Sequence, residues 1–187
     1  MWQWTSDLTA NRAYQGFVGR TNELDTLRGV LATAGPRVVH VYGITGIGKT
    51  ALLDMLATDA RGAGASVIRL DCRHIEPTEP GFLHALGGAI GDGGPEVDML
   101  VERLGLLGPT VLLALDSYEV FRLLDTWLRQ IFVPLLSDNV RIVFFSRQRP
   151  LNVWFSAPDW GRLVQSVPVQ PLSPTEAQVL LNLHGIQ

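Results

Sequence analysis

A glycine-rich loop that ends in a lysine and a threonine is the first stretch whose residue types could do chemistry. The loop reads GITGIGKT from Gly43 to Thr50 and matches the pattern G-x-x-x-x-G-K-S/T. Glycines lack a Cβ atom and accept positive φ, so their backbone can wrap closely around an anion and direct N–H groups at it. In such a loop the lysine, here Lys49, reaches the β- and γ-phosphates, and the threonine hydroxyl ligates Mg²⁺. The loop therefore predicts a phosphate-binding site.

An aspartate and a glutamate follow the most apolar run of the sequence. Asp116 ends the run TVLLALDS, where its carboxylate would hold Mg²⁺ through water. An aspartate at the end of a strand also suits a turn, which is the competing interpretation. Glu119 lies three residues further and could act as general base towards an attacking water. It could equally be a solvated glutamate in the first turn of the next helix, and the sequence leaves both interpretations open.

An arginine follows a second apolar run, VRIVFFSR. Arg147 stands at the end of this run, where it would contact the γ-phosphate and report whether that phosphate is present. The alternative is a surface arginine that pairs with a neighbouring acid, and Arg149 takes the phosphate role if the strand ends later. The expected catalytic residues are Lys49, Asp116, Glu119 and Arg147. The expected metal ligands are Thr50 and Asp116.

The elements that must position these residues alternate along the chain. The expected strands cover 37–43, 66–73, 110–117, 140–147 and a short run within 162–172. The expected helices cover 21–35, 49–64, two short helices within 79–108, then 121–136 and 173–185. The expected caps are Thr21 for the first helix and a capping box of Ser173 and Glu176 for the last. Apolar strands that are each followed by a helix predict a parallel sheet covered on both faces, with ligands at the carboxyl ends of the strands.

The composition narrows the class of protein further. The 187 residues fit one domain, and 47% of them are hydrophobic, which is enough for a sizeable core. The net charge of -3 argues against a dedicated nucleic-acid-binding protein, because such proteins are usually basic. The single cysteine, Cys72, cannot form an internal disulfide, so the reducing cytoplasm is the expected location. The N-terminus does not read as a signal peptide, and no apolar run reaches the length of about 18 residues that a membrane span needs.

Five stretches together resemble the nucleotide-binding domain of the STAND class of signal-transduction ATPases, which is related to the NB-ARC and AAA+ proteins. FVGRTNELDTL is similar to the N-terminal box of that class, and GITGIGKT is its Walker A loop. VLLALDSYE resembles the Walker B strand, and IVFFSRQRPL resembles the sensor strand with its arginine. VPVQPLSPTEAQVLLNLHGI is similar to the segment that leads into the lid subdomain. The resemblance spans roughly residues 16 to 186.

The resemblance implies an α/β fold: a three-layer αβα P-loop NTPase with a mostly parallel, about five-stranded sheet. It also implies that Phe17 and Val18 lie against adenine and that Arg20 holds the N-terminal box near the nucleotide. The full set of expected nucleotide contacts is Phe17, Val18, Arg20, Gly43, Ile44, Thr45, Gly46, Ile47, Gly48, Lys49, Thr50 and Ala51. The expected cofactors are ATP or ADP with Mg²⁺. The implied behaviour is a switch in which ADP holds a closed form, ATP favours an open form, and slow hydrolysis resets the protein.

The same resemblance predicts the domain organisation. We expect an N-terminal arm at 1–15, a P-loop ATPase core at 16–172, and the start of a truncated lid subdomain at 173–187. The chain is thus expected to be part of a longer protein. Its expected partners are the nucleotide, the other domains of that protein and a nucleotide-dependent homo-oligomer, with no direct nucleic-acid contact and no membrane.

One departure from the family pattern keeps other functions open. The class carries a second acidic residue directly after the Walker B aspartate, and here that position is Ser117, with Glu119 as the candidate substitute. A nucleotide-dependent interaction module without useful hydrolysis is therefore the alternative. A GTPase is disfavoured because Lys49 is the only lysine in the sequence, so the N/T-K-x-D motif with which GTPases bind guanine is missing. A small-molecule kinase is disfavoured because no basic lid follows.

Overall fold

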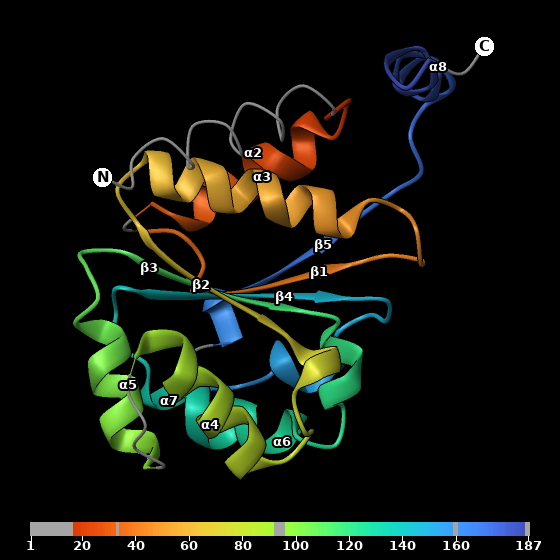
Figure 1. Cartoon of the computed structure of the whole chain (residues 1–187). Coiled ribbons are helices and arrows are strands. Elements are labelled where there is room, and N and C mark those ends of the chain that lie inside the picture. The colour runs from red at the N-terminus through yellow and green to blue at the C-terminus, as the bar shows by residue number, and fades with distance from the viewer. Residues whose placement is uncertain (1–16, 33, 92–95, 159–160, 186–187) are drawn as a thin grey trace.

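The computed structural model describes residues 17–32, 34–91, 96–158 and 161–185. Within these ranges lie the five predicted strands: β1 (Val38–Tyr42), β2 (Ser66–Asp71), β3 (Val111–Asp116), β4 (Val140–Ser146) and β5 (Val164–Pro168). They pair in parallel in the order β2-β3-β4-β1-β5 (Figure 1). β3 and β4 are buried along their whole length, as continuous apolar runs in a covered sheet require. The predicted arm at 1–15 lies outside the described residues.

Helices cover both faces of the sheet. On one face lie α2 (Thr21–Val30) and α3 (Lys49–Gly62), and on the other lie α4 (Glu79–Ile90), α5 (Val97–Gly105), α6 (Asp125–Trp127) and α7 (Val133–Leu135) (Figure 1). Shorter helical turns are η1 (Cys72–His74), η2 (Tyr118–Phe121), η3 (Leu128–Phe132), η4 (Asn152–Trp154) and η5 (Gly161–Leu163). The last described helix is α8 (Pro174–Leu183). This arrangement is the three-layer α/β P-loop NTPase fold, and it confirms the predicted fold class.

Each face of the sheet has its own apolar core. Between the sheet and α2 and α3, the core contains Leu27 and Leu53, which are fully buried. Between the sheet and the opposite helices, large aromatic side chains dominate, and Phe82 packs edge to face against Phe132 with ring centroids 4.9 Å apart. Because helices cover both faces of the sheet, its accessible part is the end where the C-termini of the strands and the loops after them lie.

The expected helix at 121–136 is confirmed only in part. Its first residues belong to the 3₁₀ turn η2, and α6, η3 and α7 then follow one another without a break from Asp125 to Leu135, with η3 as a π-helical middle. Pro134 explains part of this result, because proline has no N–H and its ring clashes with the carbonyl one turn earlier. A helix that meets such a proline widens locally, and a π-turn is one way to do so.

The two helix-start predictions had different outcomes. Thr21 is not a cap: α2 begins at Thr21, and the cap position belongs to Arg20, whose φ of 58° lies in the left-handed region. The capping box of α8 is confirmed, because Ser173 Oγ accepts from the Glu176 N–H at 3.2 Å and Glu176 Oε2 accepts from the Ser173 N–H at 2.8 Å. Among the described residues, no helix is both long and apolar enough to cross a membrane.

Candidate nucleotide-binding site

The glycine-rich loop connects β1 to the N-terminus of α3, at the edge where all the strands end (Figure 1). Gly48 has φ 100°, a conformation that residues with a Cβ rarely adopt, and it leads directly into the helix. A Cβ on Gly43 would lie 2.9 Å from the carbonyl oxygen of Val169, so this position also needs glycine. The loop therefore delivers the positive end of a 14-residue helix and its free N–H groups to one spot.

Lys49 is the first residue of that helix, and its side chain folds back across the loop. The ammonium group donates to the carbonyl oxygens of Gly43 at 2.8 Å and Ile44 at 2.9 Å. Partial burial lowers the pKa of Lys49, while the carboxylates of Glu119 and Asp116 act to raise it and Arg147 acts to lower it. The Lys49 ammonium is therefore within electrostatic reach of the other three predicted catalytic residues.

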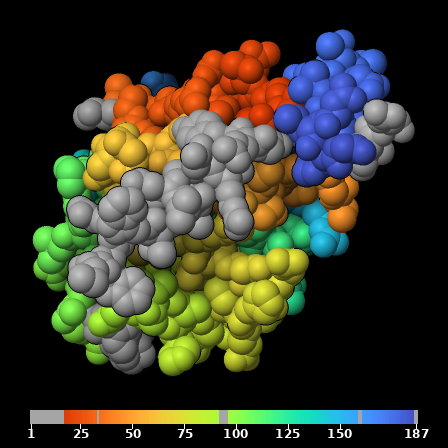
Figure 2. Space-filling view, turned by 45° about the horizontal axis from the view of Figure 1, so that its top comes forward, coloured from red at the N-terminus to blue at the C-terminus, as the bar shows by residue number. Residues whose placement is uncertain are grey.

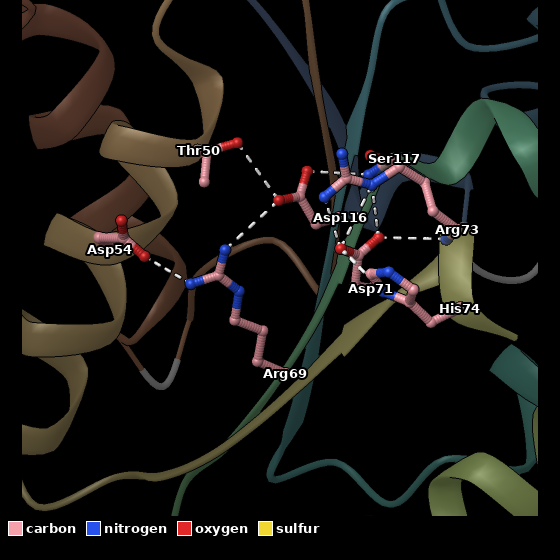
Figure 3. A network of polar contacts seen from close by, with 8 residues as sticks. All are labelled: Thr50, Asp54, Arg69, Asp71, Arg73, His74, Asp116 and Ser117. Carbon is pink, nitrogen blue, oxygen red and sulfur yellow. Dashed lines mark hydrogen bonds and ion pairs between the residues drawn. The ribbon is translucent and has the colours of Figure 1, made fainter.

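The two predicted metal ligands are in contact. Thr50 Oγ1 donates to Asp116 Oδ2 at 3.3 Å, and the N–H of Ser117 donates to Asp116 Oδ1 at 2.8 Å (Figure 3). Asp116 is buried, so its charge is held by these partners rather than by bulk water. A hydroxyl and a carboxylate that meet beside the phosphate loop are oxygen ligands of the kind that Mg²⁺ prefers, so the residues present fit that ion.

Arg69 on β2 is a third partner of Asp116, and the sequence reasoning missed it. Its Nη2 donates to Asp116 Oδ2 at 3.4 Å, and its Nη1 donates to Asp54 Oδ1 on α3 at 2.5 Å. Figure 3 shows the guanidinium between these two carboxylates. A charged residue inside the strand run SVIRLD was the signal that could have drawn attention to this position.

A second carboxylate lies at the end of the neighbouring strand. Asp71 pairs in register with Asp116, and it accepts from the Arg73 guanidinium at 2.6 Å. The hydrogen bonds from Arg73 lower the pKa of Asp71 to about 2. Both strand ends therefore carry a carboxylate that is in contact with an arginine.

Glu119 and Arg147 form an ion pair with each other. The backbone N–H of Arg147 donates to Glu119 Oε2 at 3.0 Å, and Nε lies 3.0 Å from Oε1. The Glu119 side chain is only 15% exposed, so it is not the solvated glutamate of the second interpretation. Arg147 pairs with an acid, as its alternative interpretation stated, but that acid is the candidate base itself. Arg149 instead lies over the ring of Tyr42, with 5.8 Å between its Cζ atom and the ring centroid.

Arg20 links three segments around the loop. It is buried, and its guanidinium donates to the carbonyl oxygen of Ile47 in the loop and to that of Gln170 at 2.9 Å. Phe17 is half-buried beside the core under α2 and α3, and Val18 is also half-buried. The structure thus brings the N-terminal box to the loop. At the tip of the loop, the exposed residues are Ile44, Thr45 and Gly46, and Thr50 and Ala51 are exposed at the start of α3.

The helix α8 lies beside this box. A Cβ on Gly19 would fall 2.3 Å from Glu176 Oε1, so α8 and the box are in close contact. Figure 2 shows α8, in blue, next to the red start of the described chain. A groove of about 640 Å³ is lined by the start of α2, by β5 and the segment after it, and by Glu176 of α8.

A comparison with family models decides the family. Residues 16–183 match the model described as the AAA ATPase domain. The chain belongs to this family. It is therefore an AAA+ ATPase domain, a nucleotide-binding class of P-loop protein. None of the curated proteins that were compared with the sequence matches it.

Solved structures share the fold at low identity. The Aeropyrum pernix ORC1 protein, solved in complex with DNA, is 22% identical with a TM-score of 0.66, over 90% of this chain and 50% of that chain. A Drosophila ORC structure bound to DNA is 14% identical with a TM-score of 0.62, over 96% and 50%. A chain of the Escherichia coli MS115-1 HORMA:CdnC:Trip13 complex is 14% identical with a TM-score of 0.58, over 92% and 70%. This AAA domain therefore spans about half the length of the first protein it resembles.

Proposed function

We propose that this AAA domain binds ATP and ADP with Mg²⁺ at the glycine-rich loop and acts as a regulatory switch in a larger signal-transduction protein of the STAND class. The observation that carries the proposal is the convergence of Lys49 and Thr50, at the start of α3, with Asp116 at the end of a buried strand. A bound nucleotide is stabilised by backbone N–H donors, a cationic side chain and a metal ion that act together on its phosphates. In this proposal the loop N–H groups and Lys49 supply the first two, and Thr50 and Asp116 would hold the metal ion.

Each residue has a defined part in the proposed chemistry. The loop N–H groups and the α3 N-terminus bind the phosphates, and the Lys49 ammonium turns from the two loop carbonyls to the β- and γ-phosphates. Thr50 and Asp116 would hold Mg²⁺, which neutralises phosphate charge when it is bound. Arg147 contacts the γ-phosphate, and Glu119 orients the attacking water once Arg147 has left it.

The switch depends on contacts that differ between the two nucleotides. A γ-phosphate that recruits Arg147 changes the pairing of Glu119, whereas ADP leaves that pair intact. Arg20 and Glu176 connect the loop region to α8, which we assign to the start of a lid subdomain. The proposed partners are other domains of a longer protein and further copies of this chain, without direct nucleic-acid contact.

The second candidate is a nucleotide-dependent interaction module without useful hydrolysis. It is favoured by Ser117 at the position of the second acidic residue and by the pairing of Glu119 with Arg147. Turnover of Mg²⁺-ATP by the wild type and by Glu119→Gln separates the two candidates. A wild-type rate about 10²-fold or more above the variant supports general-base hydrolysis by Glu119. Equal background rates would support the interaction module.

Nucleotide identity is tested by competition. Unlabelled ATP, ADP and GTP are each titrated against a fluorescent adenine nucleotide on the wild-type protein in Mg²⁺. We expect ATP and ADP to displace the probe and GTP to require a concentration at least about tenfold higher, which corresponds to about 1.4 kcal/mol of discrimination. GTP that competes as well as ATP would contradict an adenine-specific site.

A further inference from the structure

Arg69 occupies an unusual place for a cation, directly beside the carboxylate that is the proposed metal ligand. Its guanidinium contacts the same oxygen, Asp116 Oδ2, that accepts from Thr50 (Figure 3). A bound divalent cation would draw on this same carboxylate. Arg69 and Mg²⁺ therefore compete electrostatically for one buried negative charge.

Asp54 is a second carboxylate partner of Arg69. It lies one turn after Thr50 on α3 and binds the other terminal nitrogen of Arg69 at 2.5 Å. The Asp54 side chain is 47% exposed and that of Asp116 is 7% exposed, so the bridge runs from the surface to the buried carboxylate. A small rotation about the Asp54 contact separates Arg69 from Asp116 without leaving the guanidinium unpaired.

The charge balance of the site depends on this bridge. Without a metal, the Asp116 carboxylate would repel the phosphates of a nucleotide bound at the loop. Arg69 offsets that repulsion because a cation already lies against Asp116. With a metal in place, the same guanidinium weakens the site, because it lies close to a second positive charge.

We propose that Arg69 is a built-in substitute cation that sets how strongly nucleotide binding depends on Mg²⁺. It allows ADP to stay bound when Mg²⁺ is absent, and it turns towards Asp54 when the metal binds. This inference rests on the proposed nucleotide function and extends it to the metal dependence of the resting state.

The test measures the affinity of a fluorescent ADP analogue by anisotropy, with saturating Mg²⁺ and with a chelator. The quantity of interest is the ratio of the dissociation constant in chelator to that in Mg²⁺. For Arg69→Gln we expect this ratio to rise by about fivefold or more, because metal-free binding weakens while binding with Mg²⁺ is unchanged or tighter.

Two further variants test whether Asp54 acts on metal dependence through Arg69. Asp54→Asn removes the negative charge of the second partner of Arg69, so the guanidinium favours Asp116, and the ratio should fall. In the double variant the Asp54 change should have no effect on the ratio, since the residue through which it acts is gone. Asp54→Asn keeps Arg69 and its contact with Asp116, so it tests the proposal even if Arg69→Gln does not fold.

Arg73→Gln is the matched control. It removes the same charge two residues beyond the end of β2, in η1, where Arg73 forms its ion pair with Asp71 rather than with Asp116. A ratio that rises equally in Arg73→Gln would assign the effect to general charge and overturn the proposal. An unchanged ratio in Arg69→Gln, or an unchanged ratio in Asp54→Asn, would overturn it as well. A wild-type protein that binds no analogue even with Mg²⁺ would instead contradict the proposed function and, with it, this inference.

Discussion

At the scale of single residues, His40 shows what a covered parallel sheet does to a titratable group. The ring is buried in β1, stacked on Phe144 with centroids 4.6 Å apart, and Trp154 lies edge-on at 4.7 Å. Its Nε2 has no hydrogen-bond partner among the described residues. Burial alone lowers the pKa of His40 to about 3.

This lowered pKa predicts acid sensitivity. The unfolded state binds a proton below its ordinary pKa of about 6.5, whereas the folded state resists protonation down to about 3. Stability is therefore present at neutral pH and is lost as pH falls through that window. Between pH 7 and pH 5 we expect His40 to contribute a loss of about 2 kcal/mol in urea unfolding. His40→Phe should remove that part of the loss, and identical pH slopes for both proteins would contradict the assignment.

At the residue scale, the sequence predicts the loop from one continuous stretch, whereas contacts between residues far apart in the sequence could not be predicted. Eight consecutive residues specify the loop, because its geometry comes from local backbone freedom. The contacts of Asp116 with Arg69 and of Glu119 with Arg147 join residues that are distant in sequence. They depend on which strands lie side by side, so the sequence left Glu119 and Arg147 with two interpretations each and gave no role to Arg69.

At the scale of elements, Asp125 holds together the irregular helical region after β3. It is buried, and Oδ1 accepts from the Tyr118 hydroxyl at 2.7 Å and from the Trp154 indole N–H at 2.8 Å. These partners come from η2 and η4, so one carboxylate links three short elements. Short helices have little stability of their own. The side-chain hydrogen bonds to Asp125 therefore take over part of the stabilisation that the backbone hydrogen bonds of a long α-helix would give.

Asp125→Ala should therefore be strongly destabilising. It leaves the buried hydroxyl of Tyr118 and the indole of Trp154 without this acceptor, and we expect a loss of about 3 kcal/mol in the free energy of unfolding. The matched control is Asp138→Ala, because the Asp138 side chain is 99% exposed and pairs with Arg37 at the surface. That change should cost less than about 1 kcal/mol. Equal losses in the two variants, measured by urea denaturation, would show that the network carries no special stability.

The same region shows where the prediction of helices from sequence was incomplete. The apolar spacing of 121–136 is typical of one amphipathic helix, and the pattern gave no weight to Pro134 within it. The strands and the helices α3, α4, α5 and α8 were located correctly because their signals are local: apolar runs, glycine ends and the capping box of Ser173. Thr21 failed as a cap because its neighbour Arg20 adopts the left-handed conformation and takes the cap position itself.

At the scale of the whole molecule, Arg20 joins parts of the chain that the fold brings together from opposite ends. It binds the loop through the Ile47 carbonyl and the segment before α8 through the Gln170 carbonyl. The parallel sheet with helices on both faces could be predicted from the alternation of elements. The strand order could not, because alternation does not say which strands are neighbours.

Arg20→Ala should loosen the loop and the start of α8 together. Two carbonyls would lose a charged donor, so we expect about 2 kcal/mol lower stability and about tenfold weaker nucleotide binding. Arg28→Ala in α2 is the control, because the Arg28 side chain is 44% exposed and forms ion pairs with Asp25 and Asp59. A nucleotide affinity for Arg20→Ala equal to that of the control would separate Arg20 from the site.

The central claim is that the loop from Gly43 to Thr50 binds the phosphates of an adenine nucleotide. Calorimetric titration of Mg²⁺-ADP into the wild type and into Lys49→Ala tests it most directly, with circular dichroism as the check that both proteins are folded. The Lys49 ammonium contacts only loop carbonyls among the described residues, so its removal should leave the fold intact. We expect the wild type to bind one equivalent and the variant to bind at least about tenfold more weakly, which corresponds to about 1.4 kcal/mol. A folded variant with unchanged affinity would contradict the assignment of this loop as the phosphate site.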